Sequence, residues 1–431
     1  MYLRRTRALK CALKPFNPSV QPRSVSHTFA TRPRKDPLAY NCGINAEPWY
    51  RYEVGGYHPI ALGDVFKDGR YKVLHKLGWG GYSTVWAAKD QRKQQYVALK
   101  VSVAEIYGKR RELQVLRTLA GLNSKDNGSR HVMQFFDHFH VEGPNGKHEC
   151  LVLEFLGPSV TDVIDSWFPC KYVRLLGSLA KTSIQHALVG LAYLHKHNIA
   201  HGGTPPDLHT RQLTFSIPSL HTLTEAELFQ KLGSPETGAV TRKDGKPLEA
   251  NMPAYLVGPI CYPIAESLSQ PHIKIADFGE SFLNNDVPKT LHTPVVLRPP
   301  EVIFRDKLDY RVDLWSTGCM IFELITGRPP FDSFGATRVS VVREMLENAS
   351  DDLPERWQKK WQTMDRAWTG EKRDNVLQKW LKETYYYDGR KAEFTREDLV
   401  SVGAIVRRLL HFEPSTRASA KDILEDGWFV K

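Results

Sequence analysis

The sequence has few cysteines and no long hydrophobic run. Its six cysteines in 431 residues include no CxxC pair, so nothing indicates a structural zinc site or the disulfide framework of a small secreted domain. The best apolar candidate, residues 318–327, is interrupted by Glu323 and falls short of the roughly 18 uncharged residues that a membrane-spanning helix needs. We therefore expect a chain suited to a reducing compartment and not integrated into a membrane.

Acidic side chains are absent from the first 35 residues, which hold nine of the 59 Lys and Arg residues. The rest of the chain carries 50 basic and 48 acidic residues, so most of the net charge of +11 comes from this tail and predicts no nucleic-acid-binding domain. Leu3, Leu9, Leu13 and Phe16 stand among basic residues as in an amphipathic helix. The tail resembles a mitochondrial transit peptide, and a disordered basic arm or a misassigned start codon are the alternatives.

Beyond the tail, a strand-rich part precedes a helix-rich part. Short strand patterns begin near residue 47, and residues 104–120 and those from about 172 onward show helical spacing. An insert of roughly 55 residues, 216–270, is rich in Pro, Gly and charge, and we expect a surface excursion with one helix rather than a domain. We predict an α+β chain with three parts: a basic tail (1–46), a β-rich lobe (47–157) and a helical lobe (158–431).

Closely spaced glycines stand between two strand-like segments in LGWGGYSTVW. Gly78 and Gly80 are followed by Gly81, and Ser83 takes the place of a third spaced glycine. Glycines allow backbone N–H groups to approach phosphate oxygens without a side chain in the way. A plain hairpin turn has the same pattern, so the glycines alone do not decide between the two interpretations.

Three charged residues strengthen the phosphate-binding interpretation. Lys100 follows Val-Ala-Leu one strand after the glycines and would point toward the same phosphates. Glu112 is the best placed carboxylate to hold it, with Glu105 as the alternative. Asp277 ends a strand in IKIADFGE, where its carboxylate suits a hard cation.

Further segments carry a resemblance to a known family. With LRPPEVIF, RVDLWSTGCMIFELITGRPPF and PSTRAS downstream, the sequence resembles the eukaryotic protein kinases over about residues 65–430. The preceding flank, which includes YEVGGYHPIALGDVF, resembles the SR-protein kinases, particularly the short fungal-type members. The resemblance implies a bilobal protein kinase fold, with a small β-rich lobe and a large helical lobe.

The resemblance also implies cofactors, partners and a location. ATP and Mg²⁺ would be the cofactors, and the acceptor would be a Ser or Thr hydroxyl of a protein, with arginine-serine-rich proteins as candidate substrates. We expect a monomer that binds neither nucleic acid nor membrane. The family favours the cytoplasm or nucleus, whereas the basic tail favours the mitochondrion.

The resemblance assigns roles to individual residues. Asp207, Lys100 and Glu112 would be catalytic, and Asp277 and Gln212 would bind Mg²⁺. Glu301 would pair with Arg417, and Asp313 would support the catalytic loop. The residues expected to contact the nucleotide are Leu77, Gly78, Gly80, Gly81, Ser83, Val85, Ala98 and Lys100.

The loop at residues 200–215, AHGGTPPDLHTRQLTF, departs from the family pattern. Asp207 and Gln212 keep the family spacing, but His201 aligns with the loop histidine only if residues 203–206 are an insertion. Two prolines before Asp207 restrict the backbone, and a displacement of about 1 Å can cost on the order of a hundredfold in rate. His209 replaces a lysine, which reduces the positive charge near the phosphate.

Three functions therefore compete. The first is an active serine/threonine kinase, which the retained Gly78, Lys100, Glu112, Asp207 and Asp277 favour. The second is a pseudokinase that binds nucleotide or partners without catalysis. The third is a small-molecule phosphotransferase, because HG…DLH also occurs in that class; the kinase-type segments downstream argue against it. No arginine precedes Asp207, so an active enzyme is expected to need no phosphorylation of its activation segment.

Overall fold

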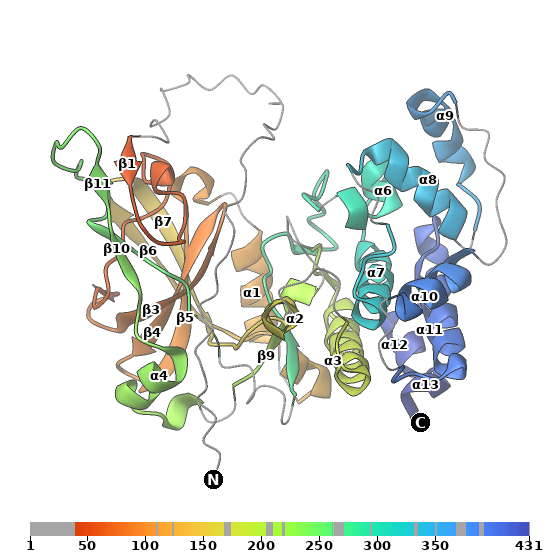
Figure 1. The fold of residues 1–431 in the computed structure, drawn as a ribbon, viewed down its shortest axis with the longest axis horizontal. Helices are drawn as coiled ribbons and strands as arrows, with labels where there is room; N and C mark the ends of the chain where they lie inside the picture. The colour runs from red at the N-terminus through yellow and green to blue at the C-terminus, as the bar shows by residue number, and fades with distance from the viewer. Residues whose placement is uncertain are drawn as a thin grey trace, which may run out of the picture.

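The computed structural model describes most of the chain beyond the basic tail. Figure 1 shows a β-rich lobe beside a helical lobe, so the expected fold class is confirmed. The tail expectations fall on residues 1–38, which lie outside the described residues. The described residues are 39–108, 111–122, 125–167, 174–203, 210–217, 220–260, 262, 271–293, 295–331, 335–349, 351–367, 376–387 and 392–430.

A six-stranded antiparallel sheet forms the body of the N-terminal lobe. Along β5, Val97, Leu99 and Val101 pack into the core on one face, whereas Ala98 and Lys100 face the other way. This alternation follows from the two-residue period of a strand and sends Lys100 toward the helical lobe. The strands, in sheet order, are β2 (Val65–Phe66), β3 (Tyr71–Gly80), β4 (Ser83–Asp90), β5 (Gln95–Ser102), β7 (Gly146–Glu154) and β6 (Phe135–Gly143).

The one long helix expected at residues 104–120 is shorter than its pattern indicated. A 3₁₀ turn occupies Ala104–Ile106, and helix α1 spans Glu112–Gly121 beside the sheet (Figure 1). Gly108 lies between them with a φ of 68°. That left-handed backbone ends regular structure at the glycine, so α1 begins only at Glu112.

Helices build the C-terminal lobe around α3 and α7. In α7, 13 of the 15 residues are buried, which explains the apolar run at 318–327 as core. Among the described residues, no helix combines the length and apolarity required to span a membrane. The helices are α2 (Val160–Trp167), α3 (Gly177–Lys196), α6 (Pro300–Ile303), α7 (Val312–Thr326), α8 (Arg338–Asn348), α9 (Glu355–Met364), α10 (Val376–Tyr386), α11 (Arg396–Leu409), α12 (Ala420–Leu424) and α13 (Gly427–Val430).

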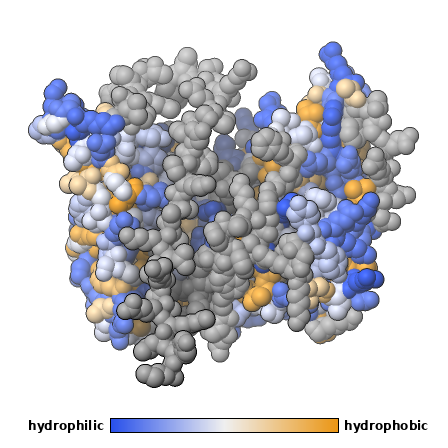
Figure 2. Space-filling model, viewed as in Figure 1, coloured by the Kyte–Doolittle hydropathy of each residue, from blue (hydrophilic) through white to orange (hydrophobic). Residues whose placement is uncertain are grey.

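Polar side chains cover the outside of this helical lobe. On the face drawn in Figure 2, hydrophilic residues predominate over its outer helices. The amphipathic helices α9, α10 and α11 account for this pattern, because each buries one apolar side and exposes the other. Buried Trp357, Leu381 and Val402 belong to the side that faces the core.

The insert is more structured than expected. It contains the expected helix, α4 (Glu225–Leu232), together with β10 (Thr237–Ala239), β11 (Thr241–Arg242) and β12 (Tyr255–Val257). β11 pairs with β1 (Tyr40–Asn41), and Leu228 and Leu232 pack against Leu74 and Ala87 of the large sheet. The insert therefore lies along the N-terminal lobe (Figure 1), although its ends emerge from the C-terminal lobe. The expected helix is present, and the structure adds three short strands that pack with it on the N-terminal lobe.

A cluster of three imidazole rings lies at the start of β13 (Ile273–Ile275). The ring centroids of His131 and His186 are 4.3 Å apart, and those of His131 and His272 are 4.7 Å apart. Ile273 N–H donates to His186 Nδ1 at 3.2 Å, and the Ile273 carbonyl lies 2.9 Å from His131 Nδ1. Burial and the neighbouring rings lower the pKa of His186 to about 4, and burial followed by His131 lowers the pKa of His272 to about 4.

We expect this cluster to make the folded chain sensitive to acid. Each ring stays neutral in the folded chain, whereas in the unfolded chain it binds a proton near pH 6.5. The unfolding free energy is therefore highest above pH 6.5 and falls as the pH decreases toward 4, because only the unfolded chain binds these protons. The nearby positive charges of Lys274 and Arg130 also lower the pKa of His272. For these partly exposed rings we expect a loss of about 1 kcal/mol in unfolding free energy between pH 7 and pH 5.

Urea unfolding at the two pH values checks this expectation. The double variant His186→Gln and His272→Gln should show a flatter pH dependence than the wild-type chain, because glutamine does not titrate. An equal pH dependence in the two proteins would contradict the expected role of the rings.

Candidate active site

A cleft with a volume of about 380 Å³ lies between the two lobes. Its lining combines a charged group, in which Lys100 contacts Glu112 and Asp277, with apolar side chains that include Leu77, Leu153 and Leu156. A ligand with a flat apolar group and an anionic tail matches this combination.

Most residues expected to bind the nucleotide line this cleft. The strands β3 and β4 form one wall of the cleft, whereas Gly81, in the turn between them, is not among the lining residues. A Cβ added at Gly78, Gly80 or Gly81 would meet nothing within 4 Å, so the space beside the turn is open to a ligand. The expected residues that line the cleft are Leu77, Gly78, Gly80, Ser83, Val85, Ala98 and Lys100.

Lys100 lies between two carboxylates in the charged group. Its Nζ is 2.6 Å from Glu112 Oε1 and 3.2 Å from Asp277 Oδ1. The Glu112 side chain is 1% exposed and the Lys100 side chain 9%, so this pair is shielded from solvent. Glu105, the alternative partner, instead pairs with Arg51. Glu112 therefore makes the contact that fixes Lys100.

Asp277 is the exposed member of this group. It follows β13, has a φ of 61°, and its side chain is 47% exposed at the cleft. Left-handed backbone at a residue other than glycine is uncommon and is maintained by its surroundings. The position gives the carboxylate access both to Lys100 and to a ligand.

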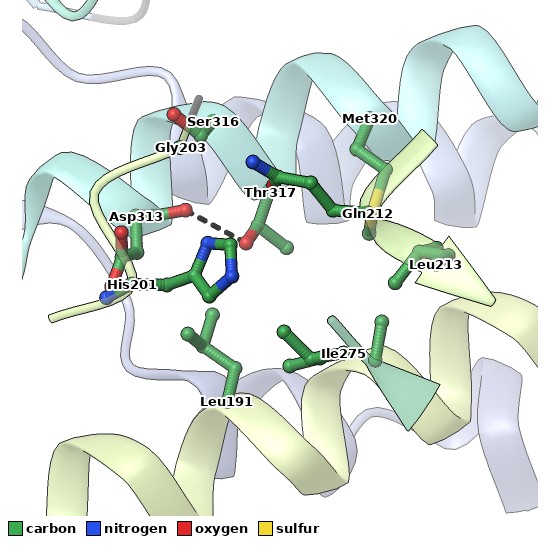
Figure 3. A pocket seen from close by; sticks show the side chains of 11 residues that line it. Leu191, His201, Gly203, Gln212, Leu213, Ile275, Asp313, Ser316, Thr317 and Met320 are labelled. Carbon is green, nitrogen blue, oxygen red and sulfur yellow. Dashed lines mark hydrogen bonds between the residues drawn. The ribbon is translucent and has the colours of Figure 1, made fainter. Parts of the chain in front are cut away.

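Gln212 lies next to this strand but faces elsewhere. β13 pairs with β9 (Leu213–Phe215), and Ala276 N–H donates to the Gln212 carbonyl at 2.8 Å. The Gln212 side chain is only 8% exposed and lines a smaller pocket of about 50 Å³ under the catalytic loop (Figure 3). It is not among the described residues that line the large cleft, so its metal-binding role stays a prediction.

His201 connects the catalytic loop to two other elements. Its Nε2 lies 3.0 Å from the Ala276 carbonyl, and its backbone N–H donates to Asp313 Oδ2 at 2.8 Å. The Gly202 N–H donates to the other Asp313 oxygen at 2.8 Å, as expected for a supporting residue under the loop (Figure 3). Gly202 has a φ of 78°, and a Cβ there would approach the Glu280 carbonyl to 2.4 Å.

The unusual part of the loop is not described. Asp207, His209 and the two prolines fall in residues 204–209, which lie outside the described residues. The described residues resume at Thr210, and the Thr210 hydroxyl lies 2.6 Å from the hydroxyl of Thr161 in α2. The roles of Asp207 and His209 therefore stay predictions from the sequence.

The sequence reasoning missed several residues that line the cleft, and two of them, Arg211 and Tyr262, come from segments far from the glycine turn. Arg211 lines the cleft from the catalytic loop, and Tyr262 lines it while its hydroxyl donates to the Leu156 carbonyl at 3.1 Å. Tyr262 comes from the end of the insert, far from Leu156 in the chain. No short motif marks either residue.

Comparison with known proteins identifies the family. The protein kinase domain model matches residues 71–203 and 266–429, more than half of the chain. The chain belongs to the protein kinase family. A kinase-domain crystal structure aligns with a TM-score of 0.58 at 20% identity, covering 86% of this chain and 98% of that one. The matched ranges leave out residues 204–265, and with them Asp207 and Gln212.

Individual relatives refine this placement. The serine/threonine-protein kinase SRPK of Physarum polycephalum is 29% identical over 403 residues, covering 88% of this chain and 90% of the relative. SRSF protein kinase 3 of Homo sapiens is 38% identical over 160 residues, covering 36% of this chain and 28% of the relative. The chain is thus a protein kinase similar to relatives that are named as serine/threonine-protein kinases and as SR-type kinases.

The charged group of the cleft suits a magnesium nucleotide. In the described part of the chain, no group of three His, Cys, Asp or Glu side chains is arranged to hold a metal ion by itself. Mg²⁺ is often held by one or two carboxylates together with phosphate oxygens, and Asp277 offers such a carboxylate beside Lys100. The residues present therefore fit Mg²⁺ that arrives with a nucleotide.

Proposed function

We propose that this kinase transfers the γ-phosphate of Mg·ATP to Ser or Thr hydroxyls of proteins. The observation that carries the proposal is the contact of Lys100 with both Glu112 and Asp277 in the charged group of the cleft. Phosphate transfer depends on placing charges around the phosphates rather than on covalent chemistry by the protein. A buried lysine held by Glu112 and an exposed carboxylate 3.2 Å from it supply such charges.

Each part of the cleft has a role in this proposal. The apolar side chains would contact the adenine ring, and the glycine turn at residues 78–81 would cover the phosphates with backbone N–H groups. Lys100 would contact the phosphates, while Asp277, with Gln212 as a second candidate, would hold Mg²⁺. Bound Mg²⁺ would neutralise charge on the phosphates during transfer.

Asp207 would orient the acceptor hydroxyl. Its spacing to Gln212 matches the family loop, and His201 holds the start of that loop against Asp313 and Ala276. The contacts of His201 before residues 204–209 and of Thr210 after them support the proposal. We propose that Asp207 reaches the acceptor and that the kinase acts as a monomer.

Arginine-serine-rich proteins are the candidate substrates. This proposal comes from relatives whose names include SRPK and SRSF protein kinase 3. Serines in such tracts lie beside arginines, so a serine- and arginine-rich peptide is the first acceptor to test.

Transfer of labelled γ-phosphate to this peptide tests the proposal. We expect the wild-type kinase with Mg·ATP to label the peptide, and Asp207→Ala to lower the rate by about a hundredfold, because the hydroxyl would lose its orienting group. A peptide with alanine in place of serine is the control for the acceptor.

The other outcomes distinguish the alternatives. Nucleotide binding without transfer by either protein would favour the pseudokinase. Transfer to a small alcohol or amine but not to peptide would favour the small-molecule phosphotransferase. Equal rates for the wild type and Asp207→Ala would contradict the role of Asp207.

A further inference from the structure

The segment before the kinase domain contacts the back of the glycine turn. This segment, Trp49–Tyr57, contains the YEVGGYHP motif in part and has no role in the proposed chemistry. The Tyr57 hydroxyl donates to the Gly80 carbonyl at 2.8 Å, and Arg51 Nη2 donates to the Gly81 carbonyl at 3.0 Å. We call these two side chains, Arg51 and Tyr57, the brace.

The local fold explains how the two side chains reach the same turn. The Tyr57 N–H donates to the Arg51 carbonyl at 3.0 Å, which closes a tight turn across residues 51–57. A Cβ on Gly56 would lie 1.8 Å from that carbonyl, so only glycine fits. The Arg51 guanidinium then lies 5.6 Å from the centre of the Tyr57 ring, a distance suited to a cation–π contact.

The brace itself is held in place. Tyr57 is 1% exposed, and burial raises the pKa of its phenol to about 12, so it remains a donor at neutral pH. Arg51 also pairs with Glu105 at 2.9 Å. Gly55 N–H donates to the Asn145 carbonyl, and Ala104 N–H donates to the Gly56 carbonyl, so the backbone of the segment is fixed to the lobe at both glycines.

The contacts set the orientation of two peptide groups in the turn. In a trans peptide, the carbonyl and the following N–H point in opposite directions. The N–H groups of Gly81 and Tyr82 therefore point away from the brace. Gly78 and Gly80 line the cleft, whereas Gly81 and Tyr82, like Arg51 and Tyr57, are not among its described lining residues. The two oriented N–H groups therefore lie beside the cleft, at the end of the strands that line it.

We propose that Arg51 and Tyr57 are positioning residues that hold the glycine turn with its N–H groups ready for nucleotide phosphates. The proposal rests on the proposed function for the nucleotide site, but it concerns binding rather than transfer. A glycine-rich turn without such contacts loses conformational freedom when it closes on phosphates. With the brace, the turn already loses part of this conformational entropy when the chain folds, so less is lost on binding and the nucleotide binds more tightly.

Titration with ADP and with adenosine, both in Mg²⁺ buffer, tests the proposal. Tyr57→Phe removes only the hydroxyl, and we expect the Kd for ADP to rise about fivefold, as for one lost hydrogen bond. The Kd for adenosine, which has no phosphates, should stay unchanged. Arg51→Met should raise the Kd for ADP by a similar factor, and a urea unfolding curve shows whether the variant, whose Arg51 side chain is 29% exposed in the wild type, keeps the fold.

Tyr52→Phe is the matched control. Tyr52 lies in the same segment and is also 1% exposed, but its hydroxyl bonds to Glu47 instead of the glycine turn. We expect Tyr52→Phe to leave the Kd for ADP unchanged. The proposal is overturned if the Kd for ADP does not change in Tyr57→Phe and Arg51→Met, if adenosine weakens as much as ADP, or if Tyr52→Phe has the same effect.

The binding measurements separate this proposal from the proposed function. A chain that transfers no phosphate but shows the expected changes for ADP would refute the catalytic proposal and support the brace. In an active kinase, the same variants should raise KM for ATP about fivefold with little change in kcat.

Discussion

Asp277→Asn should lower kcat for phosphate transfer by about a thousandfold, the upper part of the range for removing one charge-stabilising group at a reaction centre. Asparagine keeps the size of the side chain and an oxygen that can accept from Lys100 Nζ, which lies 3.2 Å from Asp277 in the wild type. It also tolerates the left-handed backbone with a φ of 61°. The variant therefore removes the negative charge while keeping the shape of the site.

The lost charge explains the size of the effect. Glu112 is 1% exposed and occupied by Lys100 at 2.6 Å, so it cannot take over as the carboxylate that faces the ligand. An amide oxygen binds a hard cation more weakly than a carboxylate, because it lacks the negative charge that Mg²⁺ prefers. ADP binding in Mg²⁺ buffer should weaken less than kcat falls, since the charge matters most during transfer.

Asp286→Asn is the matched control for this prediction. Asp286 follows the next strand, β14 (Phe282–Leu283), and it pairs with Arg111 at 2.9 Å, but both side chains are more than 40% exposed. Exposed ion pairs contribute little, so transfer should remain within about twofold of the wild type. Steady-state rates on the serine- and arginine-rich peptide measure both variants. Retention of a tenth of the activity by Asp277→Asn would exclude its role as the main metal ligand.

Local sequence patterns predicted where Lys100 and Asp277 lie, because the position of each depends on residues next to it in the chain. Lys100 faces the cleft because a strand alternates its side chains, and Asp277 follows a strand ended by a sharp turn. The glycine turn was predictable for the same reason. Helix α1 began later than expected because the single Gly108, with its φ of 68°, outweighed the apolar spacing around it.

Contacts between distant segments were not predictable from one sequence. The insert lies on the N-terminal lobe because Leu228 and Leu232 find an apolar surface there, and its composition gave no sign of that surface. Tyr57 and Gly80 meet through a turn whose direction depends on Gly56. Gln212 keeps the family spacing, yet its side chain lines the smaller pocket. In each case, packing between segments decided where the side chain lies.

Arg417→Met should destabilise the fold by about 3 to 5 kcal/mol, the cost of breaking a buried ion pair from one side. The guanidinium contacts Glu301 through two parallel bonds of 2.7 and 2.8 Å, and the two side chains are 0% and 2% exposed. Arg417 also donates to the carbonyls of His411 and Arg311. Its loss leaves the buried Glu301 carboxylate without these two bonds and removes a hydrogen bond from the carbonyls of His411, Arg311 and Phe412.

Burial, rather than distance, should decide the size of this effect. Arg356 makes ion pairs just as short, 2.7 Å to Asp306 and 2.6 Å to Glu413, but its side chain is 47% exposed. Arg356→Met is therefore expected to cost less than about 1 kcal/mol, because water already solvates its partners. Urea unfolding monitored by tryptophan fluorescence measures both variants.

A double variant identifies the physical cause. When Arg417→Met is combined with Glu301→Gln, no charge remains buried, and the loss should be smaller than for Arg417→Met alone. If the lost packing of Arg417 over Trp315, whose ring centre lies 5.3 Å away, were the main cause, removing the Glu301 charge would restore nothing. An equal or larger loss in the double variant would therefore assign the destabilisation to packing. A smaller loss in the double variant would assign the destabilisation to the unpaired Glu301 carboxylate, which Arg417 neutralises in the C-terminal lobe.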